Sequence, residues 1–302
     1  MTTAEPTTGT VRKAVIPAAG YGTRFLPATK AQPKEMIPVV DRPAIQYVVE
    51  EAVAAGITDI LIVTSTNKQT MENHFDRAPD LERTLEAKGK TDALDEIVRI
   101  ADLATIHFIR QPEARGLGHA IGMGAAHVGD EPFAVLLPDD LMIDDGALLR
   151  RMISVAGDHP GAAVISVKEF PGAEVSAYGA ADPIEIDGDV MKLRGIVEKP
   201  PPEEAPSQFG STGRYVFPPE IFDEIARTKP GHGGEIQITD AMANLAAGAG
   251  LYAVSFVEGR YDVGQKLDYL RATVELGLAH PELGGQFADV LASIVAERGI
   301  GS

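Results

Sequence analysis

The stretch VRKAVIPAAGYGTRFLPATKAQPKEMIP, residues 11–38, joins a short apolar strand to a glycine turn that carries several cations. Gly20 and Gly22 lack a Cβ, so the backbone can turn tightly there and direct its N–H groups at phosphate oxygens. Arg24 and Lys34 place positive charge along the same turn. The stretch therefore indicates a site that holds the phosphates of a nucleoside triphosphate.

Buried strands alternate with helices after this turn. Residues 45–53 place apolar side chains at the i, i+3, i+4 spacing of one helix face, and Gly56 ends that helix. The run DILIVTS at residues 59–65 is apolar on both faces, which is typical of a parallel strand covered by helices on both sides. The pattern returns at residues 105–111 and 133–140. We expect a Rossmann-like α/β fold: an open, mixed, mainly parallel sheet flanked by helices.

The second half of the chain is richer in strands. Residues 162–168 form another buried run, and alternation around residues 187–188 predicts a hairpin. A further strand is expected at residues 251–257, and helices are expected at residues 266–278 and 286–297. In the first half, the charged segment 79–101 predicts a solvated helix pair between two strands.

Composition limits the class of protein. With 302 residues and 44% hydrophobic content, the chain can bury a large core as one domain. The net charge of −17 argues against a nucleic acid partner, because such a partner needs a clustered basic face. The sequence has no cysteine, which excludes disulfides and thiolate chemistry. The chain has no run of roughly 20 apolar residues to span a membrane, and its first ten residues do not resemble a signal peptide. We expect a cytoplasmic protein without a membrane partner.

Two better-known phosphate-binding motifs fit the glycine turn poorly. A dinucleotide site needs a third glycine where Phe25 stands, and an acid at the end of the second strand, where Thr64 and Ser65 stand. Asp41 lies at about the expected distance for that acid, but in a proline-flanked turn before a helix. A P-loop is also disfavoured, because no glycine–lysine–serine or –threonine run is present.

Polar residues follow the strands at their carboxyl ends, where ligands of an open parallel sheet bind. Gln111 follows the third strand, Asp139 and Asp140 follow the fourth, and Glu198 and Lys199 follow a later one. A strand turns successive side chains to opposite faces, so we expect one of the two aspartates to face the ligand. The other, for which Asp140 is the better candidate, is expected to cap a helix or turn.

Each of these residues also has a simpler interpretation. Asp139 and Asp140 are also typical of acids that cap a helix or turn. The adjacent Glu198 and Lys199 are also typical of a surface ion pair. His119 is better interpreted as a packed histidine than as a general base. No Ser-His-Asp set, zinc-ligand spacing or reactive cysteine offers a rival nucleophile. We therefore expect a site that positions charges and forms no covalent intermediate.

Several longer blocks occur in a fixed order along the chain. They are PAAGYGTRFLPATK (17–30), PKEMIPVV (33–40), GLGHA (116–120), LPDD (137–140), VEKP (197–200), GRYV (213–216) and GGEIQITD (233–240). Together they resemble the bacterial UTP–glucose-1-phosphate uridylyltransferases over about residues 11–280. The resemblance implies a sugar-nucleotide pyrophosphorylase fold that assembles as homodimers or homotetramers.

The resemblance also implies how the chain is divided. A tail at residues 1–10 would precede a single domain at residues 11–302. Within that domain, residues 11–150 would bind the nucleotide and residues 151–265 would form a small β-rich sugar-binding part. The C-terminal helices, residues 266–302, are a candidate oligomer contact.

Position by position, the resemblance assigns the nucleotide to five residues. Ala18, Ala19 and Gly20 would contact it through their backbone, and Gln111 and Gly116 would read the uracil edge.

The remaining roles implied by the resemblance concern the sugar phosphate and the metal. Gly179 and Glu198 would bind glucose hydroxyls, and Lys199 would bind the phosphate of glucose 1-phosphate. Asp139 would hold Mg²⁺, with Asp262 as the second carboxylate.

The chemistry implied is in-line attack of a glucose 1-phosphate oxygen on the α-phosphorus of UTP, giving UDP-glucose and pyrophosphate. Two anions that repel each other must be aligned, and Arg24, Lys34, Lys199 and Mg²⁺ would neutralise their charge. No general base is required, because a phosphate monoester is already ionised at neutral pH.

Two other functions fit the same residues. A sister enzyme could use dTTP or another nucleotide, because Gln111 could read the polar edge of thymine equally well. The KEMIP block at residues 34–38 favours the uridylyl branch. A non-catalytic nucleotide-sugar sensor could dispense with Arg24, Lys34 and Asp139, and all three are present.

Overall fold

A nine-stranded sheet forms the centre of the protein, and the computed structural model describes residues 11–299 except the side chain of His232. The predicted tail at residues 1–10 lies outside the described residues, as do residues 300–302. Across the sheet the strands are β5 (Thr105–Arg110), β4 (Asp59–Thr64), β1 (Lys13–Pro17), β6 (Phe133–Leu136), β11 (Phe209–Phe217), β8 (Ala163–Glu169), β12 (Leu251–Ser255), β10 (Val190–Glu198) and β9 (Gly179–Asp187). Two small ribbons, β2 (Pro38–Val39) with β3 (Arg42–Pro43) and β7 (Asp140–Met142) with β13 (Arg260–Asp262), lie beside it.

The direction of the strands agrees with the sequence. β5, β4, β1 and β6 are parallel neighbours, and β8 is parallel to β12. In this sheet β11 and β10 run opposite to the other seven strands. The predicted open, mixed, mainly parallel α/β sheet is confirmed.

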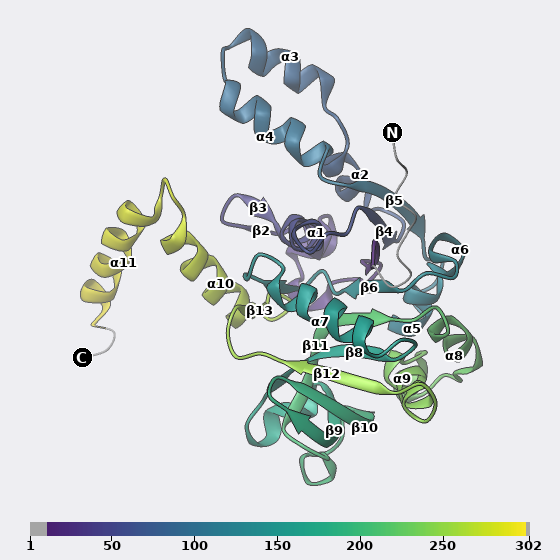
Figure 1. Cartoon of the computed structure of the whole chain (residues 1–302). Helices are drawn as coiled ribbons and strands as arrows, with labels where there is room; N and C mark the ends of the chain where they lie inside the picture. The colour runs from purple at the N-terminus through teal and green to yellow at the C-terminus, as the bar shows by residue number, and fades with distance from the viewer. Residues whose placement is uncertain (1–10, 300–302) are drawn as a thin grey trace.

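Helices cover both faces of the sheet (Figure 1). One face carries α1 (Ala44–Ala54), α2 (Gln69–Phe75) and α7 (Ala147–Asp158). The other face carries α5 (Leu117–Gly122), α6 (Ala125–Val128), α8 (Ile221–Arg227) and α9 (Ile238–Ala246). In residues 11–299 no helix has the length and apolar character needed to cross a membrane.

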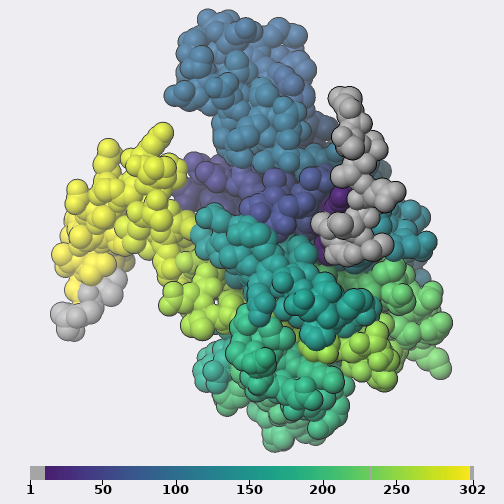
Figure 2. Space-filling model, in the orientation of Figure 1, coloured from purple at the N-terminus to yellow at the C-terminus, as the bar shows by residue number. Residues whose placement is uncertain are grey.

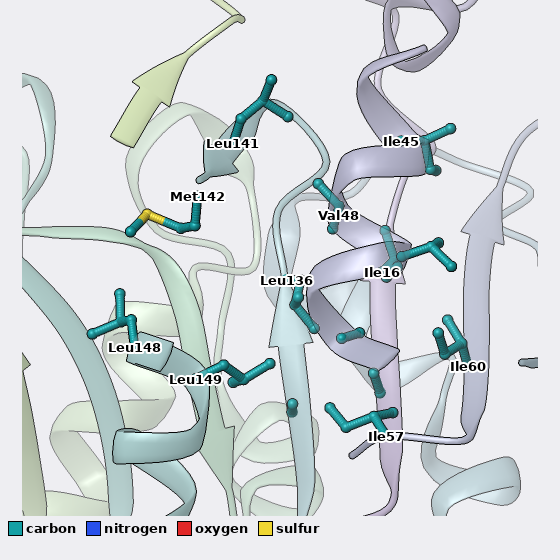
Figure 3. Close-up of a cluster of buried hydrophobic side chains, with 14 of the residues drawn as sticks. Ile16, Ile45, Val48, Ile57, Ile60, Leu136, Leu141, Met142, Leu148 and Leu149 are labelled. Atoms are coloured by element: carbon teal, nitrogen blue, oxygen red, sulfur yellow. The ribbon is translucent and has the colours of Figure 1, made fainter. Parts of the chain in front are cut away.

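The core explains why the first strands are apolar on both sides. Ala14 and Ile16 of β1 belong to one buried cluster, and Val15 between them belongs to the cluster on the opposite face. Figure 3 shows Ile16 beside Ile45 and Val48 of α1, at two of the positions that the helical spacing predicts. β1 therefore packs into two cores, one on each face, as expected of a strand in a sheet that helices cover on both sides.

Three parts of the chain project from this body (Figures 1 and 2). The predicted charged helix pair is α3 (Pro79–Ala87) and α4 (Thr91–Ala101). The predicted hairpin is β9 and β10, and the C-terminal helices are α10 (Lys266–Ala279) and α11 (Gly284–Arg298). Between β5 and β6 the chain forms two short helices, α5 and α6.

Candidate functional site

A pocket of about 440 Å³ opens where β1, β4 and β5 end. It is lined by Ala19 and Gly20 of the glycine turn, by residues 29–33, by residues 65–68 after β4 and by Gln111 after β5. Ligands bind at this edge in open parallel sheets. Three of the five residues predicted to bind the nucleotide therefore line one pocket.

The other two predicted nucleotide-binding residues have structural partners of their own. The N–H of Ala18 donates to the carbonyl of Val63 at 2.8 Å, and its carbonyl accepts a hydrogen bond from Lys68 Nζ at 2.6 Å. Gly116 has a φ of +100°, and a Cβ there would lie 2.8 Å from the backbone of Ile236. Contacts of these two residues with a nucleotide remain predictions.

A buried ion pair that was not predicted from the sequence supports the glycine turn. Lys68 Nζ lies 2.9 and 3.0 Å from the two carboxylate oxygens of Glu35, in addition to its bond with Ala18. Burial raises the pKa of Glu35 and lowers that of Lys68, although the attraction between the two charges opposes both shifts. The position of Lys68 in the sequence does indicate a site residue, because Lys68 follows the second strand at its carboxyl end.

A charged corner lies next to the turn. Lys34 Nζ is 2.5 Å from Asp139 Oδ2. Burial would raise the pKa of Asp139, but the charge and hydrogen bond of the Lys34 ammonium, together with a backbone hydrogen bond and a smaller contribution from Arg24, hold this pKa below its ordinary value. Arg24 itself is exposed in a short 3-10 turn. The two cations predicted to meet the triphosphate thus both act on the carboxylate predicted to hold the metal.

Asp262 completes this corner. A Cβ on Gly264 would lie 2.7 Å from Asp139 Oδ2 and 3.0 Å from Asp262 Oδ1, so the two carboxylates converge on one glycine backbone. Burial raises the pKa of Asp262, and the negative charge of Asp139 raises it further against the pull of Arg260. Two converging carboxylates beside this pocket are a donor set that suits Mg²⁺. The residues present therefore fit the metal that the sequence predicts.

Asp140 does not cap a helix, and this expectation was wrong. β6 ends at Leu136, so Asp140 begins β7, where it is buried and pairs in register with Asp262 of β13. Its carboxylate accepts a hydrogen bond from Arg260 Nε at 2.6 Å. The helix that follows, α7, starts at Ala147 after Gly146. Asp140 therefore forms an ion pair with Arg260, which lies far away along the chain. Spacing along the sequence cannot reveal such a pair.

Arg214, in the GRYV block, holds the loop that presents Asp139. Its fully buried guanidinium donates to the Glu51 carboxylate at 2.8 and 2.6 Å. It also donates to the carbonyl oxygens of Leu137, at 3.3 Å, and Asp140, at 2.5 Å. The GRYV block alone does not predict this role of Arg214, because its partner Glu51 lies far away on α1.

The predicted sugar-binding residues lie together on the hairpin. Gly179 and Glu198 are partners across β9 and β10. Lys199 follows with a φ of +42°, and its N–H donates to the carbonyl of Tyr178 at 3.1 Å. Lys199 Nζ is 3.2 Å from Glu198 Oε1, and the lysine side chain is about half exposed. The surface ion pair that the simpler interpretation predicts is therefore present.

Arg260 connects the hairpin to the charged corner. Its guanidinium lies 5.2 Å above the ring of Tyr178, and one of its nitrogens lies 3.9 Å from Asp262 Oδ2. The backbone of Tyr178 in turn receives the N–H of Lys199. A short chain of contacts therefore runs from the carboxylate corner to Lys199.

His119 is half-buried and bonded to a pocket residue. Its Nδ1 lies 2.7 Å from Gln111 Nε2. Burial lowers the pKa of His119, and the positive charge of Arg115 lowers it further. A neutral ring can accept the amide N–H at Nδ1, which leaves the Gln111 carbonyl oxygen free to face the pocket. The packed-histidine interpretation missed this contact.

The comparisons with known proteins agree on one family. The nucleotidyl transferase family matches residues 13–277. The UTP–glucose-1-phosphate uridylyltransferase YngB of Bacillus subtilis (strain 168) is 49% identical over 94% of this chain and 96% of its own length. A UTP-bound UGPase from Acinetobacter baumannii has a TM-score of 0.87 at 45% identity and covers 93% of this chain and 99% of its own. A UDP-glucose pyrophosphorylase complexed with UDP-glucose has a TM-score of 0.78 at 41% identity, covering 87% of this chain and 97% of its own. The chain belongs to the nucleotidyl transferase family, among the bacterial UTP–glucose-1-phosphate uridylyltransferases.

Proposed function

We propose that this chain transfers a uridylyl group from UTP to glucose 1-phosphate, releasing pyrophosphate and forming UDP-glucose. The observation that carries the proposal is the convergence of Lys34, Asp139 and Asp262 in one charged corner beside the glycine turn. A sensor needs a pocket, but it does not need two carboxylates and a lysine arranged around a phosphate site. The printed names of the relatives support the same reaction.

The nucleotide is held by the pocket at the end of β1, β4 and β5. The backbone of Ala19 and Gly20 lies against the triphosphate, while Gln111 and Gly116, the residue just before α5, read the uracil edge. Ala18 shapes the turn through its bonds to Val63 and Lys68. Binding energy in this pocket fixes the α-phosphorus in one place.

Glucose 1-phosphate, the acceptor of the uridylyl group, binds beside the hairpin of β9 and β10. Lys199 binds the phosphate of glucose 1-phosphate, and Glu198 and Gly179 bind the glucose hydroxyls. Arg24 and Lys34 neutralise the triphosphate, so the acceptor oxygen can approach the α-phosphorus in line. The bond from this phosphorus to the pyrophosphate oxygen breaks as the new P–O bond forms.

Mg²⁺ is the cofactor that we assign to Asp139 and Asp262. When bound, it would stabilise negative charge on the transferring phosphate and on the departing pyrophosphate. No side chain needs to remove a proton, because the attacking oxygen is already ionised.

Pyrophosphate release tests this reaction. We expect release with UTP, glucose 1-phosphate and Mg²⁺ together, and none when any one of them is omitted. Turnover with dTTP in place of UTP should be much lower, and a preference for dTTP would assign the chain to the thymidylyl reaction. A folded protein that binds UDP-glucose but releases no pyrophosphate would show a sensor.

We propose that the protein is a homodimer or homotetramer that associates through α10 and α11. Leu267 and Leu270 are 81% and 58% exposed, and an apolar groove of about 260 Å³ lies between the two helices. Light scattering should give a multiple of the chain mass, reduced by Leu267→Glu. The matched variant Leu81→Glu, on the projecting helix α3, should not change the mass. A monomer at all concentrations would contradict this assembly.

A further inference from the structure

A second cluster of ligand-type side chains lies at the amino ends of the strands, away from the pocket. Asp59 begins β4, and Thr64 ends that strand beside the pocket. The five steps from Asp59 to Thr64, at about 3.3 Å each, separate the two ends by roughly 17 Å. His107 of β5 and His127 of α6 lie beside Asp59. The cluster is therefore distinct from the charged corner of Asp139 and Asp262.

The fold brings these three residues together from separate elements. In the parallel pair β4 and β5, His107 is the register partner of Leu61, two residues after Asp59. Alternate residues share a face, so Asp59 and His107 point to the side of the sheet where Leu61 packs with Val128 of α6. α6 also carries His127. The three residues are distant in sequence, which explains why no zinc-ligand spacing reveals them.

The ligand atoms are close enough to share one ion. Asp59 Oδ1 lies 2.8 Å from His127 Nε2 and 3.7 Å from His107 Nε2, and one ligand atom from each residue lies within 4.8 Å of the others. Tetrahedral zinc with bonds of about 2.0 to 2.1 Å holds its ligand atoms roughly 3.3 Å apart. Rotamer adjustments alone can therefore close the site. The His107 side chain is 48% exposed, so an ion can enter from solvent.

The lysine beside Asp59 on the neighbouring strand has other partners. Lys13, the register partner of Asp59 on β1, donates to the carbonyl oxygens of His127 and Val128 at 3.2 and 3.0 Å. Its ammonium also lies 2.6 Å from Glu131 Oε1. Lys13 thus fixes α6 in place with its charge neutralised by Glu131, and the carboxylate of Asp59 remains directed at the two imidazoles.

We propose that Asp59, His107 and His127 bind a divalent transition metal, with Zn²⁺ as the expected ion. Two imidazole nitrogens and one carboxylate suit zinc, whereas Mg²⁺ prefers oxygen ligands only. Three protein ligands leave the fourth position to water. The ion ties β4 and β5 to α6, so it stabilises the native fold by preferential binding.

Zinc titration of the full chain, stripped of metal by a chelator, tests the proposal. Calorimetry in excess Mg²⁺, which keeps the Asp139 and Asp262 corner occupied, should find one Zn²⁺ per chain. Zn²⁺ should also raise the Tm. His107→Ala should weaken Zn²⁺ binding at least 10-fold and abolish the rise in Tm. The matched control His159→Ala removes a histidine that stacks on Tyr252 in another part of the molecule, and should bind zinc unchanged.

Two more variants separate this site from the proposed catalytic one. Asp59→Asn, which keeps the side-chain shape, should weaken zinc binding, and Asp139→Asn should not. Co²⁺ should give visible absorption bands of nitrogen ligation in the unmodified chain and lose them in His127→Ala. Unchanged zinc affinity in folded His107→Ala and Asp59→Asn, or loss of the ion in Asp139→Asn instead, would overturn the proposal. These readouts do not use turnover, so they stand even where the proposed reaction fails.

Discussion

The ammonium of Lys34 lies 2.5 Å from a carboxylate oxygen of Asp139, so the cation proposed to meet the triphosphate and the acid proposed to hold the metal neutralise each other. Each side chain is only about one quarter exposed. The pair keeps both groups ionised and in place, because the ammonium lowers the pKa of Asp139 while the carboxylates of Asp139 and Glu35 raise that of Lys34 against its burial. We expect this pairing to preorganise the site for two oppositely charged ligands, the proposed triphosphate and the proposed metal.

Removing Lys34 tests this pairing. Lys34→Met should lower kcat by about 10²- to 10³-fold, a typical cost of losing one electrostatic group aimed at the transition state. Steady-state pyrophosphate release at saturating substrates measures the loss. A folded Lys34→Met variant with unchanged kcat would contradict the assignment of Lys34.

The same variant changes the pH dependence of stability. Because the folded pKa of Asp139 is depressed, its stabilising contribution is present above the unfolded pKa of about 3.9 and is lost as pH falls through the folded value. Without Lys34 burial is largely unopposed and the folded pKa rises, so the stability lost on acidification should become smaller or turn into a gain. Urea unfolding between pH 3 and pH 7 measures the shift. Lys90→Met, at an exposed turn between α3 and α4, serves as the control and should leave the profile unchanged.

Lys199→Ala should reduce turnover far more than stability. The side chain is half exposed and its pair with Glu198 is of the kind that contributes about 0 to 1 kcal/mol. We expect a large loss in kcat/KM for glucose 1-phosphate and a nearly unchanged Tm. Lys199→Arg keeps the charge and should recover part of the activity. Full activity in Lys199→Ala would show that the ion pair with Glu198 is the only role of this lysine.

The sequence predicted the elements well because local patterns determine them. Strands that are apolar on both faces and separated by helices predict a parallel sheet with helices on both sides. β1 confirms this, because its side chains pack into one core on each face. The glycine turn and Gln111 were found because the ends of parallel strands meet at one edge. Spacing could not reveal contacts between distant segments. The pairs Glu35 with Lys68 and Arg260 with Asp140 form only after the chain folds, so Asp140 was mistaken for a cap.

His119 should control how Gln111 is oriented. A neutral ring accepts the Gln111 amide at Nδ1, and burial holds the pKa of His119 below its ordinary value, so the ring is neutral at pH 7. As pH falls through that lowered pKa, the protonated Nδ1 becomes a donor and the contact is lost. We expect KM for UTP to rise on the acid side while kcat changes less. His119→Leu should show the raised KM at every pH and discriminate less between UTP and dTTP. An identical KM profile in this variant would contradict the role.

The pair of Arg214 and Glu51 should be essential to stability and, through the loop, to catalysis. Both side chains are almost fully buried, and Arg214 also holds two carbonyls of the loop that ends in Asp139 and Asp140. Arg214→Met leaves a buried carboxylate unpaired, which typically costs about 3 to 5 kcal/mol. Urea unfolding at pH 7 measures the loss, and the exposed pair Arg151 with Asp189 provides the control, since Arg151→Met should cost less than about 1 kcal/mol.

The double variant Arg214→Met/Glu51→Leu separates stability from positioning. Replacing both charges by apolar groups removes the unpaired carboxylate, so stability should recover in part. The carbonyls of Leu137 and Asp140 still lack their guanidinium donor, so the loop loses its support and kcat should remain low. If kcat recovered together with stability, Arg214 would serve the fold alone, and Asp139 would not depend on it for its position.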